Sequence, residues 1–367
     1  MELEGELKNF IKVWILATAC SCYCYYIASK LPKGILRLLS LLPVFYLFII
    51  LPLILTSFRL CLLTSFLLVW LANFKLLLFS FDQGPLLSPP PRNVFHFIFL
   101  TCLPIKLKNN QNPSPDSHPV TRRLFVLVIK ASLLAILFHC YSYRHFMHPY
   151  VMFVLYCLHL YLEIELELTI SAAPARALLG FEIEPQFNEP CLATSLQDFW
   201  GRRWNLMVTN ILRPTVYYPV RHLSIRLFGS TWWSSGPAYV ATFAVSGLMH
   251  EILYFYITRV SPTWEVTCFF VLHGICVAIE VAVKKLLKDR WRFHRAISGP
   301  LTLVFGAVTA FWLFFPQPMR NKVDEKAVEE YLILVNFVKQ KLSSLIYFFF
   351  SEMIEEKYVL IPIVEEP

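Results

Sequence analysis

The amino-acid sequence predicts an all-α integral membrane protein, a transmembrane helical bundle of eight or nine spans in one domain that covers residues 1–367. Hydrophobic residues make up 57% of the chain and charged residues 16%, whereas soluble domains carry about 25% charged residues. The mean hydropathy is +0.55. The apolar residues gather in long runs, and the basic residues lie in the connections between them. A soluble fold could not bury so much apolar surface, so the excess is expected to face lipid.

Nine apolar runs approach the roughly 20 residues that a membrane-spanning helix needs. They lie at 13–29, 38–56, 60–81, 123–140, 149–168, 236–258, 264–283, 299–315 and 331–350. The stretch 94–105 is shorter, and it predicts a re-entrant or interfacial segment. Inside lipid every backbone polar group needs an internal partner, so unbroken apolar runs indicate helices.

The distribution of positive charge predicts how the helices are oriented. If nine segments cross the membrane, four connections share one side, and these connections are 30–37, 82–122, 169–235 and 284–298. They are rich in arginine and lysine, whereas the N-terminus on the other side is acidic. Basic loops remain in the cytosol, so these four connections are expected to be cytosolic. An acidic start is also unlike a signal peptide.

The sequence lacks the signatures of several other protein classes. The net charge is +8, but no nucleic-acid-binding module accompanies it, so a nucleic-acid partner is not expected. The ten cysteines include no CxxC pair and no metal-ligand spacing, and they are interpreted as small buried residues. The chain also has no glycine-rich phosphate loop and no GxSxG motif.

One histidine is notable because it lies in the middle of an apolar run. His250 is followed by Glu251 within the run 236–258, and ionisable residues inside a span indicate function. A neutral imidazole is the usual general base near neutral pH. Gly247, one turn earlier on the same face, is expected to leave room for a substrate. The alternative is a histidine hydrogen-bonded between helices. Tyr254 stands where a zinc protease motif needs its second histidine.

A dense aromatic and basic block lies inside the long connection 169–235, and connections of that length are usually functional. It reads Asp-Phe-Trp-Gly-Arg-Arg-Trp-Asn over 198–205. Arginine binds phosphates with its planar fork, an asparagine amide both donates and accepts, and an aromatic face can stack on adenine. The candidates for binding a phosphate-rich ligand are Trp200, Arg202, Arg203, Trp204, Asn205 and Arg213. The alternative is a membrane-surface anchor, where tryptophan and arginine are common.

Two further sets of polar residues lie on single helical faces. His159, Glu163 and Glu167 are spaced four residues apart, as in a proton path or metal site. A helix end that reaches the lipid headgroups is favoured, because only one histidine is present. His273 and Glu280 are seven residues apart, and they favour a buried hydrogen bond between helices.

With these residues in view, the chain resembles the plant wax synthases of the membrane-bound O-acyltransferase superfamily. The resemblance rests on six stretches that keep their order over about residues 5–320, and these are 70–79, 103–106, 175–180, 184–187, 198–205 and 245–251. The block Asp-Phe-Trp-Gly-Arg-Arg-Trp-Asn, paired with Ser-Gly-Leu-Met-His-Glu, is the specific part.

The resemblance implies an endoplasmic reticulum enzyme that joins an acyl-CoA to a long-chain alcohol and so forms a wax ester. It implies that His250 is the catalytic histidine and that the block ending in Asn205 is the second signature of the site. Relatives of this kind acetylate diacylglycerols or acylate sterols, and the motifs do not separate these acceptors. The expected partners are acyl-CoA, a lipid alcohol and membrane lipids. Neither a metal nor a bound cofactor is expected, because acyl-CoA is a co-substrate.

The chemistry of this reaction assigns expected roles. Neutral His250 removes the proton of the alcohol as its oxygen attacks the thioester carbon, a contribution of about 10²–10⁴-fold. Asn205 orients the imidazole or binds the developing oxyanion. The CoA headgroup lies against Arg202, Arg203 and Arg213, and tunnel length sets the preferred chain.

Two other classes of function compete with this one. A transporter is suggested by the acidic residues and histidine within the apolar runs, although transporters often have paired halves and this sequence shows no internal repeat. A non-enzymatic lipid-binding protein would bind acyl-CoA without turnover.

Overall fold

The computed structural model describes residues 3–87, 90–105, 120–179, 184–231, 233–287, 294–333, 335–337, 339–340 and 343–344, without the side chains of residues 3 and 120–123. The described residues form helices and their connections, and no strand occurs among them. The predicted all-α class is therefore confirmed.

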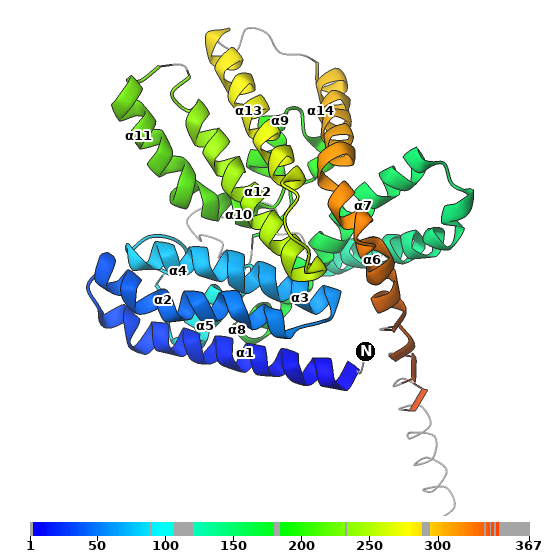
Figure 1. Cartoon of the computed structure of the whole chain (residues 1–367), viewed down its shortest axis with the longest axis horizontal. Coiled ribbons are helices and arrows are strands. Elements are labelled where there is room, and N and C mark those ends of the chain that lie inside the picture. Colours follow the sequence, from blue (N-terminus) through cyan, green and yellow to red (C-terminus); the bar gives the residue numbers. More distant parts are fainter. Residues whose placement is uncertain are drawn as a thin grey trace, which may run out of the picture.

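The first helices lie side by side and form one layer of the molecule (Figure 1). They are α1 (Leu3–Tyr26), α2 (Ile35–Ile50), a continuous helix made of α3 (Phe58–Ser65), η3 (Phe66–Ala72) and α4 (Asn73–Ser80), and α5 (Val94–Cys102). Their facing sides form a hydrophobic core in which Phe48, Trp70 and Phe97 are almost fully buried. The short helix α5 lies where a re-entrant or interfacial segment was expected.

A buried lysine joins two of these helices. The side chain of Lys75 on α4 is fully buried, and its Nζ donates to the carbonyls of Leu100 at 2.7 Å and Leu103 at 2.6 Å. The last carbonyls of a helix lack partners within the helix, and a cation there also suits the helix dipole. Lys75 therefore fastens the end of α5 to α4.

A helical hairpin follows and projects to one side in Figure 1. It consists of α6 (Val120–Cys140) and α7 (Pro149–Ser171), and the short α8 (Ala173–Leu179) comes next. Lys130 on α6 and Glu165 on α7 form an ion pair of 2.5 Å across the hairpin. This contact neutralises one of the three glutamates of α7.

The long connection predicted at 169–235 is itself largely helical where it is described. It contains α9 (Leu196–Asp198), η6 (Phe199–Arg203), α10 (Leu206–Leu212), η7 (Arg213–Tyr217) and α11 (Tyr218–Phe228). These short elements lie against the later helices α12 (Gly236–Thr258), α13 (Glu265–Leu286), α14 (Arg295–Thr309), η8 (Ala310–Phe314) and α15 (Pro316–Arg320). The steep helices α12, α13 and α14 form the second part of the molecule (Figure 1).

Seven helices of the described residues are long and apolar enough to cross a membrane. They are Glu4–Lys30, Ile35–Ile54, Phe58–Ser80, Leu124–Phe146, Gly236–Thr258, Glu265–Leu286 and Arg295–Phe314. Each coincides with a predicted span. The predicted span 149–168 forms α7, which is equally long but carries three glutamates. Half of the run 331–350 lies outside the described residues.

Candidate active site

A cavity of about 870 Å³ lies where the two parts of the molecule meet. It is lined by side chains from α3, η3, α7, η6, α10, η7, α12, α13, α14 and η8. Its lining includes six of the seven predicted site residues, and these are Trp200, Arg202, Trp204, Asn205, Arg213 and His250. Folding therefore brings the block 198–205 and the histidine of α12 to one hollow.

His250 is held in a defined orientation. Its Nδ1 lies 2.7 Å from the carbonyl oxygen of Ser246, one turn earlier on α12. A carbonyl oxygen can only accept, so Nδ1 carries the hydrogen and Nε2 of the neutral ring has a free lone pair. The ring stacks on Phe270 with 4.3 Å between centroids, and Trp70 packs edge-on at 5.1 Å. These contacts present an acceptor nitrogen in apolar surroundings.

Asn205 occupies a sharp turn between η6 and α10. Its backbone is left-handed, with φ of 37°, a conformation that asparagine tolerates better than most residues. Its Oδ1 accepts from the N–H of Val208 at 3.3 Å and so caps α10. Because Oδ1 is used in this way, the amide nitrogen remains as the donor that Asn205 can offer to the cavity.

The indole of Trp200 is fixed by a histidine on another helix. Trp200 Nε1 donates to His273 Nδ1 at 3.0 Å, and the opposite ring nitrogen, Nε2, donates to Thr309 on α14 at 2.8 Å. The predicted interhelical hydrogen bond of His273 is confirmed. Glu280 has other partners, because it pairs with Lys284 on the same helix at 2.5 Å and accepts from the N–H of Gln197 at 3.2 Å. His273 thus holds the indole of the block 198–205 in place, and Glu280 holds the residue just before the block.

Arg203 has a different environment from the other predicted arginines. Its Nε donates to Asp198 at 2.7 Å, and its Nη1 donates to the carbonyls of Asn188 and Glu189. It is absent from the cavity lining, whereas Arg202 and Arg213 contribute to it. Burial alone would raise the pKa of Asp198, but hydrogen bonds from Arg203 and a backbone N–H outweigh it and lower the pKa below its usual value. The Asp198–Arg203 ion pair and the bonds of Arg203 to the carbonyls of Asn188 and Glu189 fasten η6 to the preceding segment.

Gly247 does not leave the space for a substrate that the sequence suggested. A Cβ atom placed there would lie 2.8 Å from the Cα of Thr267 on α13. A Cβ on Gly274 would likewise lie 2.8 Å from the Cβ of Phe243 on α12. These two glycines instead let the helices approach closely, as small residues do between membrane helices. Glu251 faces the same contact, with Oε1 3.4 Å from the Thr267 hydroxyl.

Four segments of π-helix surround the cavity, and each contributes to its lining. They are η3, η6, η7 and η8, which carry Trp70, Trp200, Arg213 and Phe314 respectively. A π-helical turn contains an extra residue and often occurs at functional sites. Hydrophobic periodicity cannot reveal such a local change of pitch, so the aromatic walls formed by Trp70 and Phe314 were not predicted from the sequence.

A family model described as "Membrane bound O-acyl transferase family" matches residues 183–272, a range that holds both the block 198–205 and His250. A protein of Arabidopsis thaliana named probable long-chain-alcohol O-fatty-acyltransferase 1 is 50% identical over 93% of this chain and 100% of its own length. The chain belongs to the membrane bound O-acyl transferase family.

Two further relatives are named for two different acceptors, a long-chain alcohol and a sterol. The long-chain-alcohol O-fatty-acyltransferase of Simmondsia chinensis is 49% identical over 94% of this chain and 99% of its own length. An acyl-CoA–sterol O-acyltransferase of Arabidopsis thaliana is 44% identical over 93% of this chain and 100% of its own length. The protein is an acyltransferase and a multi-pass integral membrane protein.

The acyltransferase offers no evident metal centre in its described part. No group of three or more His, Cys, Asp or Glu side chains could hold a metal ion there. The residues that could take part in chemistry are instead the histidine, the asparagine amide and the arginines of the cavity. This set suits proton transfer and the binding of anionic groups.

Proposed function

We propose that this acyltransferase esterifies a long-chain fatty alcohol with the acyl group of acyl-CoA and so forms a wax ester. One observation carries the proposal: the Nε2 of His250 is left as an acceptor on the wall of a large apolar cavity that also holds Asn205. The acceptor alcohol is inferred from relatives named long-chain-alcohol O-fatty-acyltransferases. The endoplasmic reticulum is the proposed membrane.

The reaction balances with His250 as the only titrating group. Nε2 takes the hydroxyl proton as the alcohol oxygen attacks the thioester carbon. The tetrahedral intermediate then expels the CoA thiolate, which takes the proton back from the imidazolium. The Asn205 amide donates to the oxyanion, and such a donor is worth about 10²–10³-fold. Thioesters are already activated, so the proposal needs no covalent enzyme intermediate, metal or cofactor.

The binding of acyl-CoA is proposed to rest on the arginines of the cavity. Arg202 and Arg213 lie in its lining, beside Tyr217, whose ring packs 5.0 Å from Tyr239 near the start of α12. Planar guanidinium groups bind phosphates through paired hydrogen bonds. Arg203 is occupied by Asp198, so it is expected to support this binding indirectly.

The test uses microsomes from yeast that express the chain, supplied with acyl-CoA and a fatty alcohol. The His250→Ala variant is expected to lose about 10²–10⁴-fold in kcat with its protein level maintained. Unchanged activity would remove the proposed base. The lipid profile of the same cells separates wax esters from sterol esters and acylated glycerides, and sterol esters alone would reassign the acceptor.

The arginines are tested by the Michaelis constants. Arg202→Ala is expected to raise the KM for acyl-CoA and to leave the KM for the alcohol unchanged, because acyl-CoA carries phosphates and the alcohol does not. Arg203→Ala is expected to affect the KM for acyl-CoA less than Arg202→Ala does. An unchanged KM for acyl-CoA in Arg202→Ala and Arg213→Ala would place the headgroup elsewhere.

A further inference from the structure

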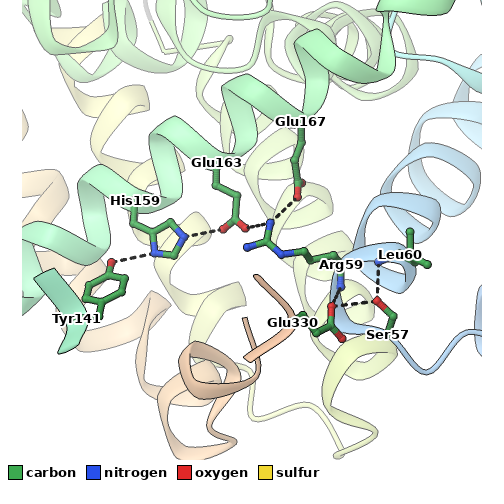
Figure 2. A network of polar contacts seen from close by, with 8 residues as sticks. All are labelled: Ser57, Arg59, Leu60, Tyr141, His159, Glu163, Glu167 and Glu330. Atoms are coloured by element: carbon green, nitrogen blue, oxygen red, sulfur yellow. Dashed lines mark hydrogen bonds and ion pairs between the residues drawn. The ribbon is translucent and has the colours of Figure 1, made fainter. Parts of the chain in front are cut away.

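A network of charged side chains from α3 and α7 contributes to the lining of the same cavity, and Figure 2 shows its contacts. On α7, Glu163 and Glu167 both line the cavity. The Nη1 of Arg59 on α3 lies 2.6 Å from Glu163 and 3.4 Å from Glu167. His159 continues the network, because its Nε2 lies 3.2 Å from Glu163. The sequence favoured a helix end among lipid headgroups here, but the structure instead pairs these side chains across two helices.

The network is firmly anchored on its α3 side. The carboxylate of Glu330 accepts from the N–H groups of Phe58, at 2.5 Å, and Arg59, at 3.0 Å. On the α7 side, the Tyr141 hydroxyl lies 2.9 Å from His159 Nδ1 (Figure 2). Glu330 therefore fixes the backbone that carries Arg59, and Tyr141 fixes the imidazole of His159 at the other end of the network.

An apolar path connects this network with His250. The side chains of α3 and η3 that line the cavity form a single stripe, and they are Phe58, Leu62, Leu63, Phe66 and Trp70. Trp70 packs against His250 at one end, and Arg59 lies at the other. Trp70 lies eleven residues after Arg59, and each residue rises about 1.5 Å, so the path is roughly 16 Å long. That is about half of a 30 Å hydrocarbon core, the depth that one lipid tail fills.

The direction of the path points away from the arginines. Tyr239, which contacts Tyr217 beside Arg213, lies on α12 before His250. Tyr256 lies after His250, and its carbonyl accepts from the thiol of Cys61 on α3, close to Arg59. The arginines and the charged network therefore lie on opposite sides of His250 along α12. An acyl-CoA with its headgroup at the arginines and its thioester at His250 must send its acyl chain along the path.

We propose that Glu167, held beside Glu163 by Arg59, ends the acyl-chain path and sets the longest acyl-CoA that the enzyme uses efficiently. This inference rests on the proposed function. Each methylene that enters the apolar stretch gains affinity by about fourfold. A chain that reaches the network gains nothing further, because a methyl group cannot replace the contacts of buried charges. The Nε of Arg59 is buried without a hydrogen-bond partner in the described part of the chain, and an alkyl tail offers it no acceptor.

The experiment measures kcat/KM in microsomes for saturated acyl-CoAs that differ by two methylenes, with one fixed fatty alcohol. For the wild-type enzyme, kcat/KM is expected to rise with length and then to fall. Glu167→Ala shortens the side chain that blocks the path, so the longest efficient substrate is expected to lengthen by one step. The chain one step beyond the wild-type limit should then be used about 16-fold better, since each of its two added methylenes gains about fourfold.

Two other variants complete the design. Leu62→Phe narrows the path before the network, so the preferred chain is expected to shorten. Glu165→Ala is the matched control, because it removes a glutamate from the same helix, but that glutamate pairs with Lys130 and is not part of the cavity lining. Its chain-length profile is expected to match that of the wild type.

The outcomes are separable. Unchanged acyl-chain profiles in Glu167→Ala and Leu62→Phe would overturn the proposal, and so would a shift seen only when the length of the alcohol is varied. A wild-type preference for acyl chains with a terminal hydroxyl would also overturn it, since the network would then recognise a polar end. If the wild type forms no ester from any acyl-CoA, the proposed function fails instead.

Discussion

The close contact at Gly247 allows a quantitative prediction for Gly247→Ala. The new Cβ would lie 2.8 Å from the Cα of Thr267 and 3.3 Å from the Cβ of Phe270. Carbon atoms in contact prefer about 3.5–4.0 Å, so α12 and α13 must separate by about 1 Å. The backbone of Thr267 cannot rotate away. Overpacking of this kind costs about 1–3 kcal/mol of stability.

The separation is expected to reach the active site. His250 lies one turn after Gly247 and stacks on Phe270 of the opposing helix, so moving the helices apart displaces the imidazole. A misplacement of about 1 Å in a reacting group costs about 10²-fold in rate. We therefore expect kcat to fall by about that factor, with a smaller change in the KM for acyl-CoA.

Initial rates of ester formation in microsomes measure the effect, and thermal unfolding in detergent measures the stability. Gly5→Ala is the control, because its Cβ would meet nothing within 4 Å, and it is expected to behave as the wild type. Wild-type rate and melting temperature in Gly247→Ala would show that the helices do not need this contact, and would refute the reasoning.

Three further outcomes are expected. Lys75→Met removes the buried donor to the carbonyls of Leu100 and Leu103 and should cost about 1–3 kcal/mol in detergent melts. Lys33→Met, at a side chain that is 70% exposed, should change little, and equal melting temperatures in the two variants would contradict this. His273→Ala removes the acceptor of the Trp200 indole and should raise the KM for acyl-CoA more than it lowers kcat; a change in kcat alone would argue against this role. Asp198 has a lowered pKa, so its ion pair stabilises the fold above the unfolded pKa of about 3.9 and is lost as pH falls through the folded value. The melting temperature of Asp198→Asn should therefore lie below that of the wild type from pH 5 to 8, and the gap should close only in stronger acid.

The sequence was sufficient to predict the helical membrane class, because that class follows from composition and from runs of apolar residues. The seven helices that could cross a membrane all coincide with predicted spans. One predicted span departs from this simple pattern because it carries charged side chains. The span predicted at 149–168 does form the helix α7, although it carries three glutamates. Glu163 and Glu165 have cationic partners on other helices, and a sequence does not show which side chains pair.

The site was predicted in part for a similar reason. His250 could be found because an imidazole in an apolar run is costly, and Trp200 and Asn205 because they stand in a dense motif. The separation of Arg202 from Arg203 could not be found, because neighbouring residues on a helix point in different directions and only the fold decides which one meets Asp198. Gly247 was misassigned because the sequence cannot tell a space left for a ligand from a space filled by another helix.

The π-helical segments around the cavity have a consequence for how such an enzyme can change. Each holds one residue more than an α-helical turn would. Losing that residue within Phe66–Ala72 would restore ordinary pitch in that turn and change which of its side chains face the cavity, while the later part of the helix kept its facing. Trp70 would then leave the wall against His250 while the rest of the bundle kept its layout. Single insertions or deletions in these segments can therefore change which side chains line the cavity. Such a change is larger than a side-chain replacement, but it leaves the surrounding helices in place.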